Sequence, residues 1–257
     1  MIPKLATAVL LAGAVAASPA AAAPGLKVIL SGGFSAAYKA LLPEFERSTG
    51  ITVESGSGAS EGEGPQTIRY QLAHGTKADV VILSGEGLAK LVEDKRIRPG
   101  SAKGLGDAAL GAAVRTGDPG QEVGTADALK QAVFHAGSVV LPGSTSGQFV
   151  RDKVFPRLKL PPEVRVEMVA RGTEAAEALR SGKVNLAIEP TSELVTEPGI
   201  HMIGLLPDDM QIVQTFTAAI VNDAENPQAA AQLIAFLSSD RALEALKKTG
   251  MQKPKRP

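Results

Sequence analysis

Residues 26–35 read LKVILSGGFS, an apolar strand-like run that ends in a small polar turn. A helical pattern follows over residues 35–49 and ends at Gly50. The first amides of a helix have no partner within the helix and carry partial positive charge, so a serine and glycine turn before a helix suits an anion. The stretch therefore predicts a strand, a turn and a helix, with a small anion bound at the turn.

The same order of strand, polar turn and helix occurs twice more. The second turn is the glycine-rich segment 56–64, ahead of a helix that begins at Pro65, and the third is 142–147, ahead of a helix over 146–158. Ligands of open α/β sheets bind beyond the carboxyl ends of the strands, where helix N-termini converge. Three such turns favour one shared anion site. The alternatives are a flexible surface loop for the second turn and a simple helix cap at Ser146 for the third.

Short apolar runs alternate with helical patterns along the chain, which is typical of α/β units around a mostly parallel sheet. The expected strands are 26–30, 51–55, 80–84, 111–115, 138–141, 164–169, 184–188 and 212–221. The expected helices are 35–49, 65–74, 87–95, 125–136, 146–158, 173–181 and 227–248, the last broken near Ser239. A length of 257 residues permits one large or two small domains, and the pattern predicts two α/β lobes.

Residues 1–23 have the pattern of an export signal peptide. Lys4 supplies the positive charge, residues 5–17 are apolar, and residues 18–23 offer several small-residue cleavage sites. The apolar run is shorter than the ~20 residues that a membrane span needs. The chain has no cysteine, which excludes a lipidated leader and disulfides. We therefore expect a soluble, periplasmic protein.

The charge balance and the composition exclude several classes of function. The chain has 27 Lys and Arg against 27 Asp and Glu, and loss of Lys4 with the leader gives 26 against 27. Without a basic excess, bulk nucleic-acid binding is not expected. The absence of Trp weakens a sugar site built on ring stacking. With no cysteine, three scattered histidines and no P-loop, we expect no metal and no cofactor.

A series of blocks in fixed order carries a family resemblance. The blocks include SGGFS at 31–35, LPEFE at 42–46, GTKADVVILS at 75–84, AVRTG at 113–117 and FTAAI at 216–220. In this order the chain resembles an extracytoplasmic solute-binding protein of the type II, molybdate-binding-like class that feeds ABC transporters. The resemblance covers nearly all of the chain after the leader.

The resemblance implies a type II periplasmic-binding-protein fold. Two α/β lobes with mixed, mostly parallel sheets would be joined by two crossover strands, and hinge motion would close them on a small anion. Residues 24–108 and 206–257 would form lobe 1, and residues 109–205 would form lobe 2. The expected partners are the anionic ligand and an ABC transporter permease in the membrane, and the protein is expected to be a monomer.

By position, the resemblance puts ligand contacts on the three turns and on several later residues. The expected ligand-binding residues are Ser31, Gly32, Gly33, Ser35, Gly58, Ala59, Ser60, Ser84, Arg115, Ser144, Thr145, Ser146, Gly147, Glu189 and Thr191. Where molybdate binders usually carry a tyrosine, this chain reads IEPTSE at 188–193. A buried Glu189 repels a dianion unless it is protonated or paired with an arginine.

Arginine chemistry then points to an organic ligand. A planar guanidinium binds carboxylates through paired hydrogen bonds, so Arg115 is predicted to contact a carboxylate, with a surface or interlobe salt bridge as the alternative. Arg69 is a weaker candidate of the same kind. We therefore expect an organic di- or tricarboxylate in preference to an oxyanion such as molybdate.

The resemblance extends to aconitate isomerase, an exported enzyme of the same class that moves a proton and a double bond in a tricarboxylate without a cofactor. An isomerase needs a base that removes a carbon-bound proton and an acid that returns one, whereas a binding protein needs only donors and a closing cleft. The side chains available for proton transfer are Glu61, Glu63, Glu189, His74, His135 and His201. Glu189 and Glu61 are the catalytic residues expected if the protein is an isomerase. The sequence favours a binding protein and leaves the enzyme open.

Overall fold

The computed structural model describes residues 25–255, so the predicted export signal at 1–23 lies outside the described residues. The strands are β1 (Leu26–Leu30), β2 (Val53–Ser57), β3 (Val80–Ser84), β4 (Lys103–Arg115), β5 (Ser138–Pro142), β6 (Arg165–Val169), β7 (Leu186–Pro190), β8 (Ile200–Leu205) and β9 (Val213–Ile220). The α-helices are α1 (Gly32–Thr49), α2 (Ile68–Ala73), α3 (Gly85–Glu93), α4 (Ala126–Ala136), α5 (Thr145–Phe149), α6 (Phe155–Leu158), α7 (Gly172–Arg180), α8 (Thr191–Leu194), α9 (Pro227–Leu237) and α10 (Leu243–Lys248). A π-helix, η1 (Val150–Val154), and two 3₁₀ turns, η2 (Asp208–Met210) and η3 (Asp240–Ala242), complete the described elements.

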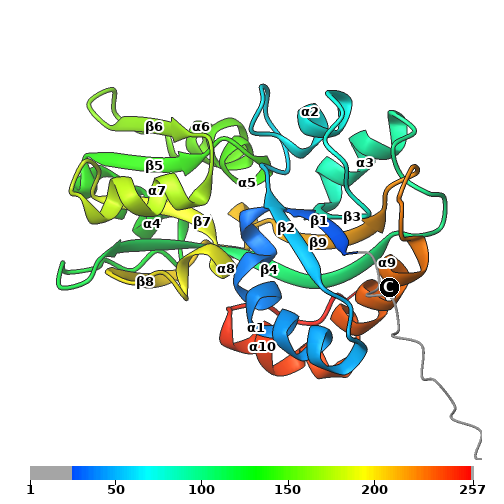
Figure 1. Cartoon of the computed structure of the whole chain (residues 1–257). Coiled ribbons are helices and arrows are strands. Elements are labelled where there is room, and N and C mark those ends of the chain that lie inside the picture. Colours follow the sequence, from blue (N-terminus) through cyan, green and yellow to red (C-terminus); the bar gives the residue numbers. More distant parts are fainter. Residues whose placement is uncertain (1–24, 256–257) are drawn as a thin grey trace, which may run out of the picture.

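The strands form two α/β lobes joined through β4 (Figure 1). The strand order is β2-β1-β3-β9-β4-β7-β5-β6, and β8 also pairs with β4. Pairing is parallel among β2, β1 and β3 and among β6, β5 and β7, and antiparallel wherever β4 or β9 takes part. The first half of β4 pairs with β9, and its second half pairs with β7 and β8. The chain therefore crosses between the lobes once along β4 and again on its way from β8 to β9.

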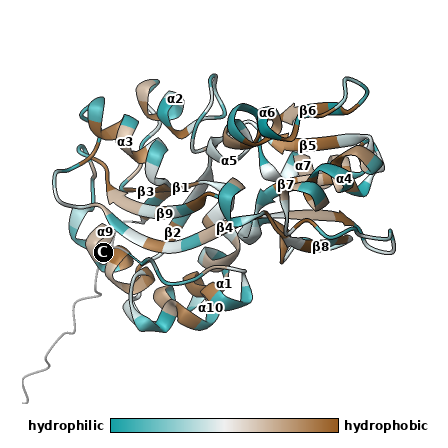
Figure 2. Cartoon of the chain, turned by 180° about the vertical axis from the view of Figure 1, so that it is seen from behind, coloured by the Kyte–Doolittle hydropathy of each residue, from teal (hydrophilic) through white to brown (hydrophobic). Residues whose placement is uncertain are grey.

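Each lobe has its own hydrophobic core. In the first lobe, Phe34 and Phe45 of α1 pack with the buried side chains of β1, β3 and β9. In the second lobe, Leu129 of α4 and Leu141 of β5 belong to a separate buried cluster. Figure 2 shows apolar residues concentrated on the strands, with hydrophilic residues on the outer faces of the surrounding helices. The separate cores fit the expected two-lobe architecture, and the lobe boundaries predicted from sequence stay a prediction.

Most elements lie close to their expected positions. The strand expected at 111–115 is longer, because β4 begins at Lys103 and serves both lobes. The helix expected at 146–158 is divided into α5, η1 and α6. The break expected near Ser239 is confirmed, since η3 begins at Asp240. Strand β8 was not expected from the sequence. Its residues have little periodicity of their own, and the strand is held at the edge of the sheet by its pairing with β4.

Three helices begin directly after strands that point at the junction of the lobes. Helix α1 follows β1, α5 follows β5 and α7 follows β6 after short turns. Their N-termini therefore meet where the lobes face each other, as expected for ligand sites in open α/β sheets. Among the described residues, no helix combines the length and the apolar character that crossing a membrane requires.

Candidate functional site

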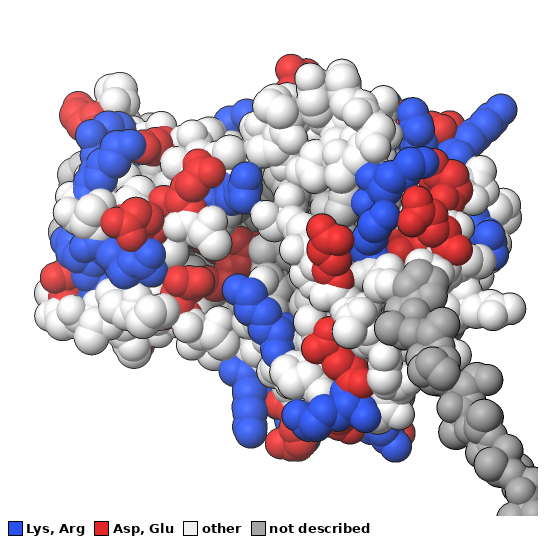
Figure 3. Space-filling view, in the orientation of Figure 1, with Lys and Arg blue, Asp and Glu red and all other residues white. Residues whose placement is uncertain are grey.

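A cavity of about 650 Å³ lies between the two lobes. Its lining comes from the turn before α1, the segment 55–60, the turn before α7, and the residues around α8. Figure 3 shows the molecule hollowed between the lobes, with both basic and acidic side chains along the hollow. The volume lies within the ~300–1,000 Å³ that is typical of small-molecule sites.

The first turn supplies a helix N-terminus and a buried hydroxyl. Ser31 and Gly32 line the cavity, and Ser31 is the extended N-cap residue of α1. The Ser31 Oγ is buried and has no hydrogen-bond partner. The first turn of α1 has no acidic side chain, so nothing on this helix neutralises its partial positive charge there.

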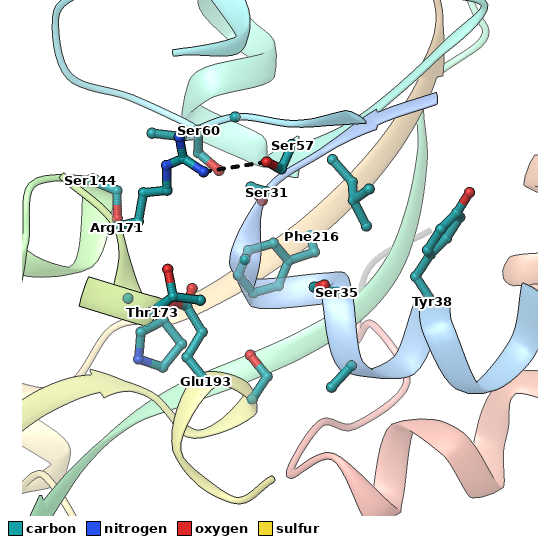
Figure 4. A pocket seen from close by; sticks show the side chains of 18 of the residues that line it. Ser31, Ser35, Tyr38, Ser57, Ser60, Ser144, Arg171, Thr173, Glu193 and Phe216 are labelled. Atoms are coloured by element: carbon teal, nitrogen blue, oxygen red, sulfur yellow. Dashed lines mark hydrogen bonds between the residues drawn. The ribbon is translucent and has the colours of Figure 1, made fainter. Parts of the chain in front are cut away.

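Gly33 has a packing role next to this turn. It lies behind the cavity, where an added Cβ would be 1.9 Å from Cζ of Phe216. The ring of Phe216 lines the cavity beside Ser35 (Figure 4). Gly33 therefore allows α1 to approach β9 closely, which holds the first turn in place.

Two further buried polar atoms at the cavity have no partner. Ser192 and Gln214 both line the cavity and are 2% exposed. Within the described residues, the Ser192 Oγ neither donates nor accepts a hydrogen bond, and the Gln214 Oε1 accepts none. Buried polar groups in folded proteins are nearly always paired, so these atoms are available to a ligand or to water.

The second turn also reaches the cavity. Gly58, Ala59 and Ser60 line it, together with Ser57. The Ser60 Oγ accepts a hydrogen bond from the Ser84 amide at 3.0 Å, which ties the turn to the end of β3. Gly58 is packed closely, because an added Cβ would be 2.7 Å from Cγ1 of Ile68.

The turn before α7 contributes an arginine that the sequence did not single out. Arg171 is exposed, lines the cavity, and donates from Nη1 to the Ser57 Oγ of the other lobe at 3.3 Å (Figure 4). Thr173 lies beside it on the same wall. Residues 169–173 form a further strand, polar turn and helix unit, so the signal used for the other three turns was present here as well.

The third turn is divided between the cavity and an interlobe contact. Ser144 lines the cavity, but Thr145, Ser146 and Gly147 lie behind it and are buried. The Thr145 Oγ1 lies 3.1 Å from the Ser84 Oγ. Gly147 is needed for packing, because an added Cβ would be 1.7 Å from the carbonyl oxygen of Pro142.

Thr145 also forms a contact that we name the interlobe latch. The Thr145 Oγ1 donates to Oε2 of Glu61 at 2.6 Å, and Glu61 Oε1 is 2.5 Å from the Nζ of Lys90. The Glu61 side chain is only 8% exposed. Glu61 is thus engaged by a lysine of its own lobe and by a hydroxyl of the other lobe.

Carboxyl groups dominate the wall formed by β7 and α8. Glu189 is fully buried, and neither of its oxygens has a hydrogen-bond partner. Burial, with the neighbouring Glu193 and Glu197, raises the pKa of Glu189 well above its usual range. Glu193 and Glu197 line the cavity, whereas Glu189 does not. Burial, with Glu197, raises the pKa of Glu193 to about 7.

The other predicted site residues lie away from the cavity lining. Arg115 donates to the carbonyl oxygen of Val184 at 2.9 Å and forms a salt bridge with Asp118 at 2.7 Å, in agreement with its salt-bridge alternative. Thr191 is buried and donates to the carbonyl oxygen of Gly250 at 2.7 Å. Ser84 is occupied by the contacts described above.

The weaker candidates also lie elsewhere. Arg69 is paired with Asp94 through two hydrogen bonds of 2.6 and 2.9 Å. His74 stacks on Tyr70 with ring centres 3.6 Å apart, and none of the three histidines lines the cavity. Within residues 25–255, no group of three or more His, Cys, Asp or Glu side chains is arranged to hold a metal ion.

A comparison with known proteins identifies the family of this chain. Residues 26–252 match the family described as bacterial extracellular solute-binding protein. The chain belongs to this family. Membership in the solute-binding proteins confirms the resemblance drawn from the ordered sequence blocks and implies a small ligand. An extracellular family agrees with the expected export, and the periplasm and the signal peptide stay predictions.

This solute-binding protein is similar along its length to an enzyme. It is 33% identical over 257 residues to the aconitate isomerase of a Pseudomonas species, with 98% of each chain covered. Among solved structures, it resembles the periplasmic molybdate-binding protein of Azotobacter vinelandii, with a TM-score of 0.71, 18% identity, and coverage of 90% of this chain and 100% of that one. It also resembles the sulfate-binding protein SubI of Mycobacterium tuberculosis, with a TM-score of 0.70, 17% identity, and coverage of 90% and 88%. These structures confirm the expected type of fold.

Proposed function

We propose that this protein binds a small organic di- or tricarboxylate in the cavity between its lobes and delivers it to an ABC transporter. The unpartnered buried atoms of Ser31, Ser192 and Gln214 carry the proposal, because leaving such groups unpaired costs about 1–3 kcal/mol each. A ligand carboxylate can accept hydrogen bonds from the Ser31 and Ser192 hydroxyls, and a hydroxyl or protonated carboxyl of the ligand can donate to the Gln214 Oε1. The N-terminus of α1 favours a negatively charged ligand at the same place.

Two features favour an organic acid over a compact oxyanion. The cavity of about 650 Å³ is large for a single tetrahedral anion and suits a branched acid with several carboxylates. Arg171 presents a guanidinium that can form paired hydrogen bonds with one carboxylate. We assign to Arg171 the role that the sequence suggested for Arg115.

A thermal-shift panel with the purified protein tests the binding role. Citrate and cis- and trans-aconitate are compared with sulfate, molybdate and tungstate. A ligand at 100 times its Kd stabilises the folded state by about 2.7 kcal/mol, which corresponds to a rise in Tm of roughly 5–10 °C for a chain of this size. We expect the organic acids to produce such a shift. A shift with molybdate or sulfate alone refutes the carboxylate preference.

The isomerisation of aconitate is the second candidate function. Two observations favour it: the 33% identity with an aconitate isomerase over nearly the whole chain, and the carboxyl of Glu193 at the cavity with a pKa near 7. A group of that pKa can take a proton from a substrate methylene and return it at the other end of the allylic system. We assign this role to Glu193 in preference to Glu189 and Glu61, because only Glu193 lines the cavity.

Turnover separates the two functions. The protein is incubated with trans-aconitate, and cis-aconitate is followed by chromatography. Product above the blank that disappears in Glu193→Gln supports the enzyme. Binding of trans-aconitate without any product above the blank leaves the protein a binding protein and refutes the enzyme.

A further inference from the structure

The carboxyl of Glu193 lies between the first residues of two helices. An added Cβ at Gly172, where α7 begins, would be 1.6 Å from Glu193 Oε2. An added Cβ at Gly32, where α1 begins, would be 3.2 Å from the same oxygen. Both glycines line the cavity (Figure 4 shows Glu193 beside Thr173 and below the turn of Ser31). One carboxyl oxygen is therefore packed against the backbone at two helix N-termini from opposite lobes.

Such a place is where an anion gains most from the unpaired amides and the partial positive charge of each helix. A ligand site there has independent support, because the Ser31 Oγ and the Ser192 Oγ are buried beside it without partners. Glu193 occupies with its own carboxyl the position that favours a small anion. A sulfate or molybdate ion entering the cavity meets this carboxylate instead of free helix ends.

We propose that Glu193 is a specificity-determining residue: its carboxyl fills the anion position between α1 and α7, excludes compact oxyanions, and accepts a hydrogen bond from a hydroxyl or a protonated carboxyl of the ligand. The inference rests on the proposed function in taking this cavity as the ligand site. It narrows the ligand class to organic acids that carry at least one donor. Like charges in contact disfavour a complex, so compact oxyanions are excluded most strongly above the pKa of about 7, where Glu193 is ionised.

The charged groups around Glu193 come from each element that packs near it. Glu189 of β7 lies within reach of the same glycine, and Glu197 follows α8. The positive groups at the cavity are Arg171, before α7, and Lys39 of α1, both of them exposed. Glu197 is held by Arg180 at 3.1 Å, so its charge is already partly compensated. Glu193 is therefore the carboxyl whose charge decides what enters the space between the helix ends.

Isothermal titration calorimetry of the full mature chain tests this assignment, with sulfate, molybdate and citrate as probes. Glu193→Gln keeps the shape and removes the charge. Glu44→Gln is the matched control, because Glu44 is exposed on α1, is paired with Arg241 at 3.6 Å and is absent from the cavity lining. At pH 8, where most of Glu193 is ionised, we expect Glu193→Gln to bind sulfate or molybdate roughly tenfold more tightly than the wild type, and Glu44→Gln to stay at the wild-type value. Because the pKa of Glu193 is about 7, oxyanion binding to the wild type strengthens from about pH 8 to about pH 6, and binding to Glu193→Gln does not change.

The outcomes separate the inference from the proposed function. Oxyanion affinity that is equal in wild type and Glu193→Gln overturns the inference, while citrate binding by both proteins leaves the proposed function standing. Failure of citrate and the aconitates to bind refutes the proposed function. A gain of oxyanion binding in Glu193→Gln then still supports the inference that the Glu193 carboxyl fills the anion position between α1 and α7. An equal gain in Glu44→Gln overturns the assignment to Glu193. Circular dichroism and the Tm of each variant verify that it is folded.

Discussion

Replacement of Arg171 is predicted to weaken organic-acid binding strongly. The guanidinium lines the cavity, projects from the second lobe and donates to the Ser57 Oγ of the first lobe at 3.3 Å. It is thus placed to bind a ligand carboxylate while the lobes are closed. Removing it leaves the ligand carboxylate with one charged donor fewer.

The size of the effect follows from the type of bond. Hydrogen bonds to charged groups contribute about 1.5–3 kcal/mol each. Since 1.4 kcal/mol is a factor of ten, Arg171→Ala should raise the Kd by about 10-fold to about 150-fold. Arg171→Lys retains the charge but loses the planar fork, so its Kd should lie between those of the wild type and the alanine variant. The bond to Ser57 is exposed and adds little to this difference.

Isothermal titration with citrate and trans-aconitate measures these affinities. Arg151→Ala is the matched control, because Arg151 is exposed in η1, is paired with Asp152 at 2.6 Å and is absent from the cavity lining. We expect the control to bind within about twofold of the wild type. An Arg171→Ala protein that binds both acids as tightly as the wild type refutes the placement of a ligand carboxylate at this residue.

Three further predictions concern packing, closure and pH. Gly33→Ala brings a Cβ to within 1.9 Å of Phe216 and should lower the stability by about 1–3 kcal/mol; an unchanged Tm contradicts the close packing. Glu61→Met and Thr145→Val each remove one partner of the latch bond of 2.6 Å, so each should open the ligand-free protein in X-ray scattering. The double variant should add nothing, and additive opening contradicts a shared contact. Burial raises the pKa of Glu193 from 4.5 to about 7, so the folded protein holds this proton more tightly than the unfolded chain does. The free energy of unfolding, measured in urea, should therefore fall as the pH rises from about 4.5 to about 7. A Glu193→Gln protein with the same decline contradicts this cause.

The sequence by itself determined the local units. Strand, polar turn and helix follow from short-range pattern and from the chemistry of helix ends, so β1, β3 and the start of the cavity at Ser31 lie where the sequence predicts them. The same local logic put Ser60 and Ser144 at the cavity. Periodicity predicted the alternation of strands and helices because it reports which faces are buried.

Only the tertiary structure decided which charged side chains reach the cavity. Arg115 and Arg171 both lie near strand ends, yet Arg115 turns to carbonyl groups of its own lobe and Arg171 faces the other lobe. Glu189 and Glu193 are four residues apart and both reach Gly172 at the start of α7, yet only Glu193 lines the cavity. Long side chains take their direction from partners distant in sequence. Those partners come together only when β4 and β9 bring the two lobes into contact.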